Sequence, residues 1–260
     1  MAAKERIVVK IGGRAAEDET ALLSLAGEFA ALSTTYDLVL VHGGGAAVSS
    51  IQKVYGIEPL FVDGKRITAP EEMDIVDMGL AGKMNKYLVR LFRKAGVNGV
   101  GLSGCDGALF SGKSFGDHEG RENRSGRIDQ CDPALVTLLW EKNFQPILSS
   151  VSYDKDGRGI NINADEAALG VAEALEASSL LFISDIPGIL NGENLISEMN
   201  EKDIEKALAE EVITGGMIPK VQSSLDALKK GVSAIVISDY KKSGDLSDMI
   251  SNNKGTKITL

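Results

Sequence analysis

The sequence has no apolar run that approaches the ~20 residues needed to cross a membrane. Cysteine is scarce: Cys105 and Cys131 are the two in 260 residues, which is typical of reduced cytosolic thiols rather than of a disulfide framework. The amino terminus enters a strand-like run almost at once and shows no signal peptide. These features indicate a cytoplasmic protein without a membrane segment.

An excess of basic residues is also absent, since the formal net charge is −9. Sequence-independent binding to nucleic acid needs a basic face, so this class of function is excluded. The chain contains no internal repeat, low-complexity tract or flexible linker, and a hydrophobic fraction of 43% is ordinary for a globular protein. At this length it can bury a sizeable core, and we expect its partners to be small molecules.

Short β-branched runs alternate with helical patterns, which predicts an α/β fold with a largely parallel sheet. The predicted core strands are Ile7–Ile11, Leu38–His42, Gly99–Leu102, Gln145–Ser149, Leu180–Ser184 and Ala234–Ser238. The predicted helices are Asp18–Leu32, Ala46–Tyr55, Glu71–Lys94, Pro133–Lys142, Ala164–Leu175, Glu201–Leu208 and Pro219–Lys230. A boundary between two lobes is expected near Leu175–Ser179, where a helix gives way to a strand.

Two segments allow more than one interpretation. Glu71–Lys94 carries an apolar stripe, which is either a core face or a dimer surface; its members are Met73, Val76, Leu80, Met84, Tyr87, Leu88 and Leu91. Gly104–Ile128 is polar and rich in glycine, and it predicts hairpins or a mobile flap. Asp154–Gly157 is a turn between extended runs.

Lys220 occupies a position that helix electrostatics disfavour. Pro219 is a suitable first helical residue, so Lys220 is expected in the first turn, at the positive end of the helix dipole. A cation there costs about 0.3–1 kcal/mol. A bound anion removes this penalty, which makes Lys220 a candidate anion ligand.

Two glycine-rich turns follow apolar runs, Val8–Gly13 and Leu40–Gly45. Glycine has no Cβ, so backbone N–H groups in such turns can approach an anion closely. Lys10 interrupts the first run just before its glycines, whereas His42 in the second is better explained as a structural hydrogen-bonding residue than as a catalyst. Together with Lys220, these turns predict a polyphosphate site.

Asn161–Glu166 has the pattern of a helix entrance. Asn163 is a suitable N-cap and Glu166 its partner in a capping box. Asp165 in the first turn can simply complement the helix dipole. Alternatively, its carboxylate orients two lysines around a triphosphate.

A competing motif is present at Gly107–Ser114, which fits the GxxxxGK[ST] pattern of a phosphate-binding loop. That motif requires a helix directly after its serine, and the residues that follow are polar and glycine-rich without an apolar period. We interpret the match as chance. No GxGxxG turn opens a helix after a strand either, so a dinucleotide fold has little support.

Seven stretches of the chain resemble the amino-acid kinase family, in family order and over nearly the whole length. They are Val8–Gly13, Val41–Gly45, Phe61–Thr68, Gly101–Gly107, Asn161–Asp165, Ser184–Leu190 and Ile213–Lys220. The resemblance implies a three-layer αβα sandwich around a mainly parallel open sheet. It also implies two lobes: residues 1–176 for substrate binding and dimerisation, and residues 177–260 for the nucleotide.

The same resemblance assigns roles to individual residues. Lys10 and Lys220 are the candidate catalytic cations, held in position by Asp165, while Gly44, Gly45, Arg66 and Asn161 are expected to bind the substrate. The expected ATP-binding residues are Gly12, Asp185, Ile186, Pro187, Gly188, Ile189, Leu190, Val212, Ile213 and Thr214. No protein metal site is expected, because Mg²⁺ is held mainly by the phosphates of ATP.

The activity implied is ATP-dependent phosphorylation of the side-chain carboxylate of N-acetyl-L-glutamate, in arginine biosynthesis. There are two alternatives. One is a sister kinase acting on N-succinylglutamate or on carrier-linked aminoadipate, and the other is a sensor that binds nucleotide or acyl-amino acid without turnover. Arginine-inhibited members that resemble this chain carry an extra N-terminal helix, whereas few residues precede the first predicted strand here. The resemblance therefore implies a homodimer without arginine inhibition rather than a hexamer.

Overall fold

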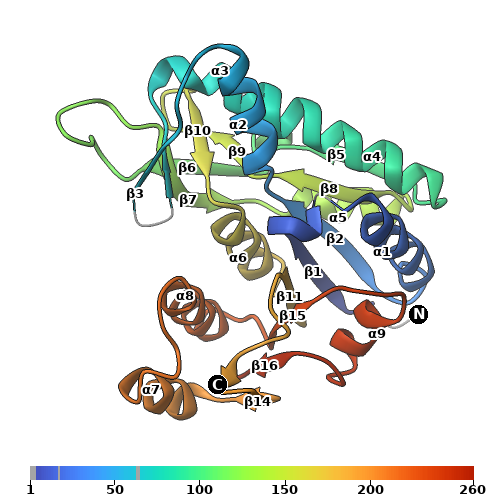
Figure 1. Ribbon diagram of the computed structural model, residues 1–260. Coiled ribbons are helices and arrows are strands. Elements are labelled where there is room, and N and C mark those ends of the chain that lie inside the picture. Colours follow the sequence, from blue (N-terminus) through green and yellow to red (C-terminus); the bar gives the residue numbers. More distant parts are fainter. Residues whose placement is uncertain (1–3, 17, 63–64) are drawn as a thin grey trace.

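The computed structural model describes residues 4–16, 18–62 and 65–260 (Figure 1). Across these ranges, eight strands form one central sheet in the order β14-β16-β15-β11-β1-β2-β8-β5. Every neighbouring pair is parallel except β15 and β16. The strands are β1 (Arg6–Ile11), β2 (Asp37–His42), β5 (Gly99–Leu102), β8 (Gln145–Ser149), β11 (Ser179–Ser184), β14 (Glu198–Met199), β15 (Ile235–Asp239) and β16 (Thr256–Ile258).

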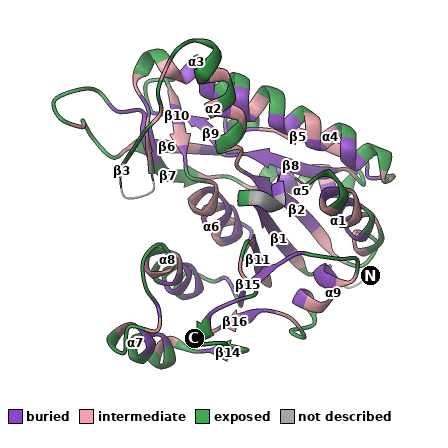
Figure 2. Ribbon diagram, viewed as in Figure 1, coloured by how far each residue is buried: buried purple, intermediate pink, exposed green. Residues whose placement is uncertain are grey.

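Helices cover both faces of this sheet, and side chains alternate along each strand between the two layers. Val8 of β1 joins one core, while Ile7 and Val9 join the other. On the Val8 side lie α5 (Ala134–Glu141), α6 (Ala164–Ala174), α7 (Glu201–Ala209) and α8 (Met217–Lys229). On the opposite side lie α1 (Glu19–Leu32), α4 (Asn85–Lys94) and α9 (Asp245–Ile250). The predicted three-layer sandwich is confirmed, with the buried strands at its centre (Figure 2).

A small closed barrel lies beside the sheet and is built from β6 (Phe110–Ser114), β7 (Ser125–Cys131), β9 (Val151–Tyr153) and β10 (Gly159–Ile162). The strands β6 and β7 pair antiparallel, so the polar glycine-rich segment forms the predicted hairpin. Two further hairpins join β3 (Leu60–Val62) to β4 (Lys65–Ile67) and β12 (Leu190–Asn191) to β13 (Asn194–Leu195).

The helix predicted over Glu71–Lys94 is confirmed, although the type of helix changes along its length. The segment comprises the 3₁₀ turn η2 (Pro70–Glu72), α3 (Met73–Asp77), the π-helical η3 (Met78–Met84) and α4. Gly79 brings the backbone of η3 against α2 (Gly45–Val54), where a Cβ would lie 2.7 Å from a methyl of Val48. Six of the seven stripe residues are buried and Tyr87 is partly buried, so the core interpretation is confirmed.

The start of α8 also differs from the prediction, because the helix begins at Met217, two residues before Pro219. Proline is tolerated there because the first four N–H groups of a helix have no partner within it. Lys220 is therefore the fourth helical residue. The chance interpretation of Gly107–Ser114 is confirmed: beyond the short η4 (Asp106–Ala108) it forms strand β6 and opens no helix. The remaining short helix, η1 (Gly13–Ala16), follows β1.

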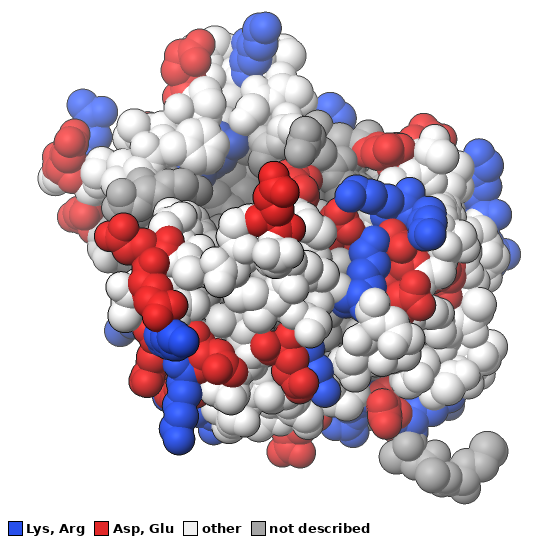
Figure 3. Space-filling view, turned by 60° about the horizontal axis from the view of Figure 1, so that its bottom comes forward, with Lys and Arg blue, Asp and Glu red and all other residues white. Residues whose placement is uncertain are grey.

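The two expected lobes share the central sheet. Helix α6 ends at Ala174 and β11 begins at Ser179, where the boundary was predicted, and β11 pairs directly with β1. Charged side chains of both signs are interspersed over the face in Figure 3. In the described ranges, no helix is long and apolar enough to span a membrane.

Candidate active site

Three charged residues that are far apart in the sequence meet beside the carboxyl end of β1. Lys10 lies two residues after Val8 in β1, so its side chain is on the same face of the sheet and points toward the layer of α6 and α8. Its Nζ lies 2.6 Å from Oδ1 of Asp165, and the other carboxylate oxygen lies 3.1 Å from Nζ of Lys220. The predicted convergence of the two ammonium groups on one carboxylate is present in the structure.

The first turn of α6 holds Asp165 rigidly. Asn163 caps the helix as predicted, and its side chain accepts a hydrogen bond from the Asp165 amide at 2.8 Å; the predicted capping box with Glu166 is not formed among the described residues. Burial raises the pKa of the Asp165 carboxyl, but Lys10 and Lys220 outweigh it, and the net pKa is below the ordinary value. Asp165 therefore stays ionised. Lys220 also lies 5.1 Å from the centre of the Phe182 ring, a further contact that stabilises its charge.

Lys10 and Asp165 line a cleft of about 260 Å³, and Lys220 adjoins it through Asp165 without being part of its lining. The cleft is also lined by Gly12, Gly44, Gly45, Arg66 and Asn161, so all predicted substrate-binding residues border one space. At Gly12, a Cβ would lie 2.3 Å from Nζ of Lys10 and would displace the ammonium. Gly44 has φ +156° and ψ 41°, a backbone conformation that other residues rarely adopt.

Arg66 is half-buried in β4, against helix α2. Its guanidinium donates to Oε1 of Gln52, to Oγ of Ser49 at 2.9 Å and to the Gly45 carbonyl at 3.2 Å. Burial lowers the pKa of this guanidinium, while Glu72 opposes the effect. Arg66 is therefore a positioned cation at the cleft and not a solvated turn residue. Asp63 and Gly64 of the same motif lie outside the described residues.

Sequence reasoning missed the polar network that supports Arg66 and Asn161. Oγ of Ser125 donates to the Arg66 carbonyl and contacts Oγ1 of Thr68 at 3.0 Å. Asn161 donates to the same Thr68 hydroxyl at 2.9 Å, and Asn123 accepts from the Thr68 amide at 3.2 Å. Thr68 follows Arg66 by two residues in the motif, which was the available signal. Asn123 and Ser125 lie in the polar hairpin, where no local pattern marks them.

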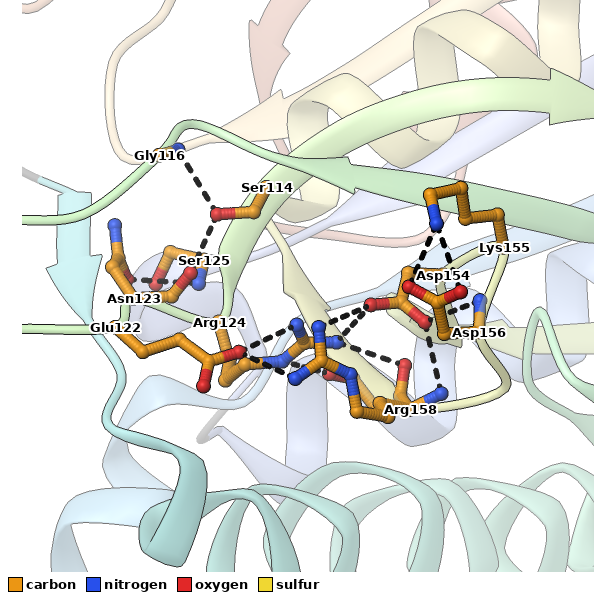
Figure 4. Close-up of polar contacts among 11 residues, drawn as sticks. Ser114, Gly116, Glu122, Asn123, Arg124, Ser125, Asp154, Lys155, Asp156 and Arg158 are labelled. Carbon is orange, nitrogen blue, oxygen red and sulfur yellow. Dashed lines mark hydrogen bonds and ion pairs between the residues drawn. The ribbon is translucent and has the colours of Figure 1, made fainter.

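An ion-pair network anchors the loop of this hairpin where it enters β7 (Figure 4). Arg124 has a side chain 4% exposed and donates to Asp154 at 2.7 Å and to Glu122 at 3.2 Å. Arg158 bonds Glu122 from the other side at 2.8 Å. Burial raises the pKa of the Asp154 carboxyl, but hydrogen bonds from Arg124 and two backbone amides outweigh it and lower the pKa to about 2. The network fixes β7 and the residues around Asn161.

Most of the residues predicted to bind the nucleotide line a second cavity, of about 190 Å³. They are Ile186, Gly188, Ile189, Leu190, Val212, Ile213 and Thr214, joined by Met217. Asp185 and Pro187 do not line it; Asp185 lies beside Gly13, where a Cβ would be 2.8 Å from its carboxylate. Met217 and Lys220 are three residues apart and share one side of α8. This helix therefore connects the second cavity with the charged groups.

Comparisons with known proteins identify the family of this chain. The profile of the amino acid kinase family matches residues 5–239. The chain belongs to this family. Curated relatives 34–37% identical are named acetylglutamate kinase; that of Nitrosomonas eutropha is 37% identical over 243 residues, or 90% of this chain and 82% of the relative.

Solved structures show the same fold. The protein smu.665 from Streptococcus mutans superposes with a TM-score of 0.81 at 27% identity, covering 99% of both chains. Carbamate kinase from Giardia lamblia superposes with a TM-score of 0.70 at 15% identity, covering 100% of this chain and 99% of that chain. The second likeness supports the fold alone. The predicted family and fold are both confirmed.

Proposed function

We propose that the protein transfers the γ-phosphoryl group of ATP to the side-chain carboxylate of N-acetyl-L-glutamate. The product is N-acetyl-L-glutamyl 5-phosphate, an intermediate of arginine biosynthesis. The observation that carries the proposal is the pair of ammonium groups, Lys10 and Lys220, that share the Asp165 carboxylate beside the cleft. The substrate follows from the name of the curated relatives.

The chemistry suits these residues. A side-chain carboxylate with an ordinary pKa of ~4.3 is already ionised at neutral pH, so the acceptor needs no general base. The barrier comes from bringing two anions together in line, and positioned cations and amide dipoles lower it. At ~4 Å and an effective dielectric of ~20, one ammonium–oxyanion pair contributes about 4 kcal/mol. Lys10 and Lys220 are the charges that supply this stabilisation.

The remaining residues bind and orient the two substrates. The amides of Gly12, Gly44 and Gly45 are assigned to the phosphoryl oxygens and the reacting carboxylate. Arg66 and Asn161 are assigned to the α-carboxylate and its neighbourhood. Arg66 suits this role because its planar guanidinium can bond a carboxylate through two N–H groups.

The lobe formed by residues 177–260 holds the nucleotide, and the lobe formed by residues 1–176 holds the amino acid. The clustering of the seven predicted residues around the second cavity supports this division. Asp185 is assigned to the region of the phosphates, since it adjoins Gly13 beside the cleft. Mg²⁺ is held mainly by the phosphates and neutralises part of their charge.

The test is incubation with Mg-ATP, a panel of acyl-amino acids and hydroxylamine, which traps an acyl phosphate as a coloured hydroxamate. We expect colour and ADP release with N-acetyl-L-glutamate. Colour with N-succinylglutamate alone would identify a sister kinase, and tight binding without ADP would identify a sensor. The homodimer and the lack of arginine inhibition stay predictions from the resemblance, and the cytoplasmic location stays a prediction from the composition of the sequence. Light scattering, cell fractionation and assays with millimolar arginine test them.

A further inference from the structure

His42, which the proposed mechanism leaves without a role, is completely buried at the end of β2 and adjoins the glycine turn of the cleft. Its Nδ1 lies 2.7 Å from the carbonyl oxygen of Gly43, and its Nε2 lies 3.0 Å from the amide nitrogen of Asn85. A carbonyl only accepts and an amide nitrogen only donates, so Nδ1 carries the proton and Nε2 accepts. Burial, the largest cause, lowers the pKa of this ring to about 4, so at neutral pH the ring is uncharged.

Asn85 holds the ring in this tautomer. Its oxygen accepts a hydrogen bond from Nζ of Lys86 at 2.9 Å, and that ammonium also donates to the Gly101 carbonyl at 2.9 Å. The amide nitrogen of Asn85 donates to the Ile147 carbonyl at 2.9 Å as well as to His42. Each polar atom of the Asn85 side chain thus has a partner that fixes its orientation. A hydrogen-bonded chain runs from Lys86 through Asn85 and His42 to Gly43.

The orientation of the Gly43 carbonyl determines where the next amide points. The described residues contain no cis peptide bond, so the C=O of Gly43 and the N–H of Gly44 point in opposite directions. The carbonyl faces the buried ring of His42, while Gly43 and Gly44 line the cleft. Within the described part of the chain, the Gly44 amide donates to no carbonyl or side-chain oxygen. It is therefore available to a ligand in the cleft.

We infer that His42 is a positioning residue: its Nδ1–H holds the Gly43 carbonyl so that the Gly44 amide points at the transferring phosphoryl group or the reacting carboxylate. The inference rests on the proposed phosphotransfer and adds to it a residue that does not touch the substrate. An amide held in advance is worth more than one that must rotate into place, because no reorganisation accompanies the reaction. Without the Nδ1 donor, the Gly43–Gly44 peptide loses the contact that fixes it.

Two substitutions separate this role from packing. In His42→Asn, the side-chain amide nitrogen takes the place of Nδ1 and can still donate to the Gly43 carbonyl. In His42→Gln, the amide reaches the position of Nε2 instead, so the contact with Asn85 is kept and the donor to Gly43 is lost. The matched control is His118→Gln, which alters the other histidine, in the hairpin outside the cleft.

Removal of one preorganised oxyanion donor lowers kcat by about 10²–10³-fold. A donor that is present but misaligned is expected to lower kcat by a smaller factor. We expect His42→Gln to lower kcat about 30-fold with KM for ATP nearly unchanged, and His42→Asn to stay within about threefold of wild type. Tight binding of ADP with aluminium fluoride and N-acetyl-L-glutamate, which mimics the transition state, is expected to weaken in His42→Gln while binding of ADP alone does not.

Full kcat in His42→Gln overturns the inference, and so does an equal loss in both variants that follows their melting temperatures. If His42→Gln does not fold, Asn85→Leu replaces it, since this change removes the donor that fixes the tautomer. We expect about a tenfold lower kcat, and an unchanged kcat overturns the inference. Absence of turnover in the wild-type protein with every acyl-amino acid removes the proposed function, and this inference with it.

Discussion

Replacement of Lys10 by methionine tests the central assignment most directly. The Lys10 side chain is 11% exposed, and its Nζ lies 2.6 Å from Asp165. Methionine keeps most of the apolar volume of the lysine stem and removes the ammonium. The substitution therefore removes charge from the cleft with little change in packing.

The expected magnitude follows from Coulomb's law. At ~4 Å and an effective dielectric of ~20, one ammonium–oxyanion pair contributes about 4 kcal/mol. Negative charge between the two substrates is greatest in the transition state, so most of this stabilisation appears in kcat. A difference of about 4 kcal/mol corresponds to roughly 10³ in rate. We expect kcat to fall by about this factor and KM for either substrate to change less than fivefold.

The assay follows ADP release and hydroxamate formation at saturating and limiting substrate. Lys202→Met, a change at an exposed position of α7, is the control for loss of a lysine charge away from the cleft. A kcat within threefold of wild type would refute the assignment. A loss confined to KM would show that Lys10 binds the ground state rather than the transition state.

Three further outcomes test separate parts of the structure. Asp165→Asn removes the charge that the two ammonium groups share, and we expect kcat to fall about 10²-fold with an unchanged circular dichroism spectrum; undiminished kcat would show that the carboxylate is dispensable. Arg66→Lys keeps the charge but loses the planar fork, so KM for the acyl-amino acid is expected to rise tenfold or more while kcat changes little, and an unchanged KM would contradict the assignment. The depressed pKa of Asp154, about 2 against an ordinary 3.8, stabilises the fold above pH ~4, and this stabilisation is lost as the pH falls toward 2. Urea unfolding of wild type and Asp154→Asn is expected to show a difference that shrinks by about 1–2 kcal/mol over that range, and a constant difference would argue against the ion pair.

Most of the central strands could be predicted from the sequence because both of their faces are buried; β5, at the edge of the sheet, is only partly buried. Gly99–Leu102 and Gln145–Ser149 have the predicted bounds, three other core strands begin one residue earlier than predicted, and Ala234–Ser238 is shifted by one residue at both ends. Strands buried on both sides form continuous apolar runs that local inspection detects. The barrel strands β6 and β7 lack this signal, since their segment is mostly polar and its pairing involves distant residues such as Asn161 and Ser125.

The two lysines of the site were also predictable because each is locally unusual, whereas Asp165 is an ordinary acidic residue in the first turn of a helix. Lys10 interrupts an apolar strand, and Lys220 places a cation near a helix amino terminus. The supporting network gives no such signal. Ser125 and Arg66 are 59 residues apart, and the bond between them depends on the register of the barrel. The π-helical segment η3 gives no local signal either, because Gly79 in it packs closely against a separate helix, α2.

The topology of the sheet accounts for the position of the cleft. From β1 the chain proceeds to β2 on one side, and β11 later pairs with β1 on the other, so the strand order reverses at β1. Ligands in open α/β sheets bind at the carboxyl ends of strands at such a reversal. Ile11 is level with His42 in β2 and with Ile183 in β11, so the three strands end at one height. Gly12, Gly43 and Asp185 follow at that edge, and α6 and α8 add Asp165 and Lys220. The convergence of charge thus depends on parallel register in the core rather than on a mobile loop.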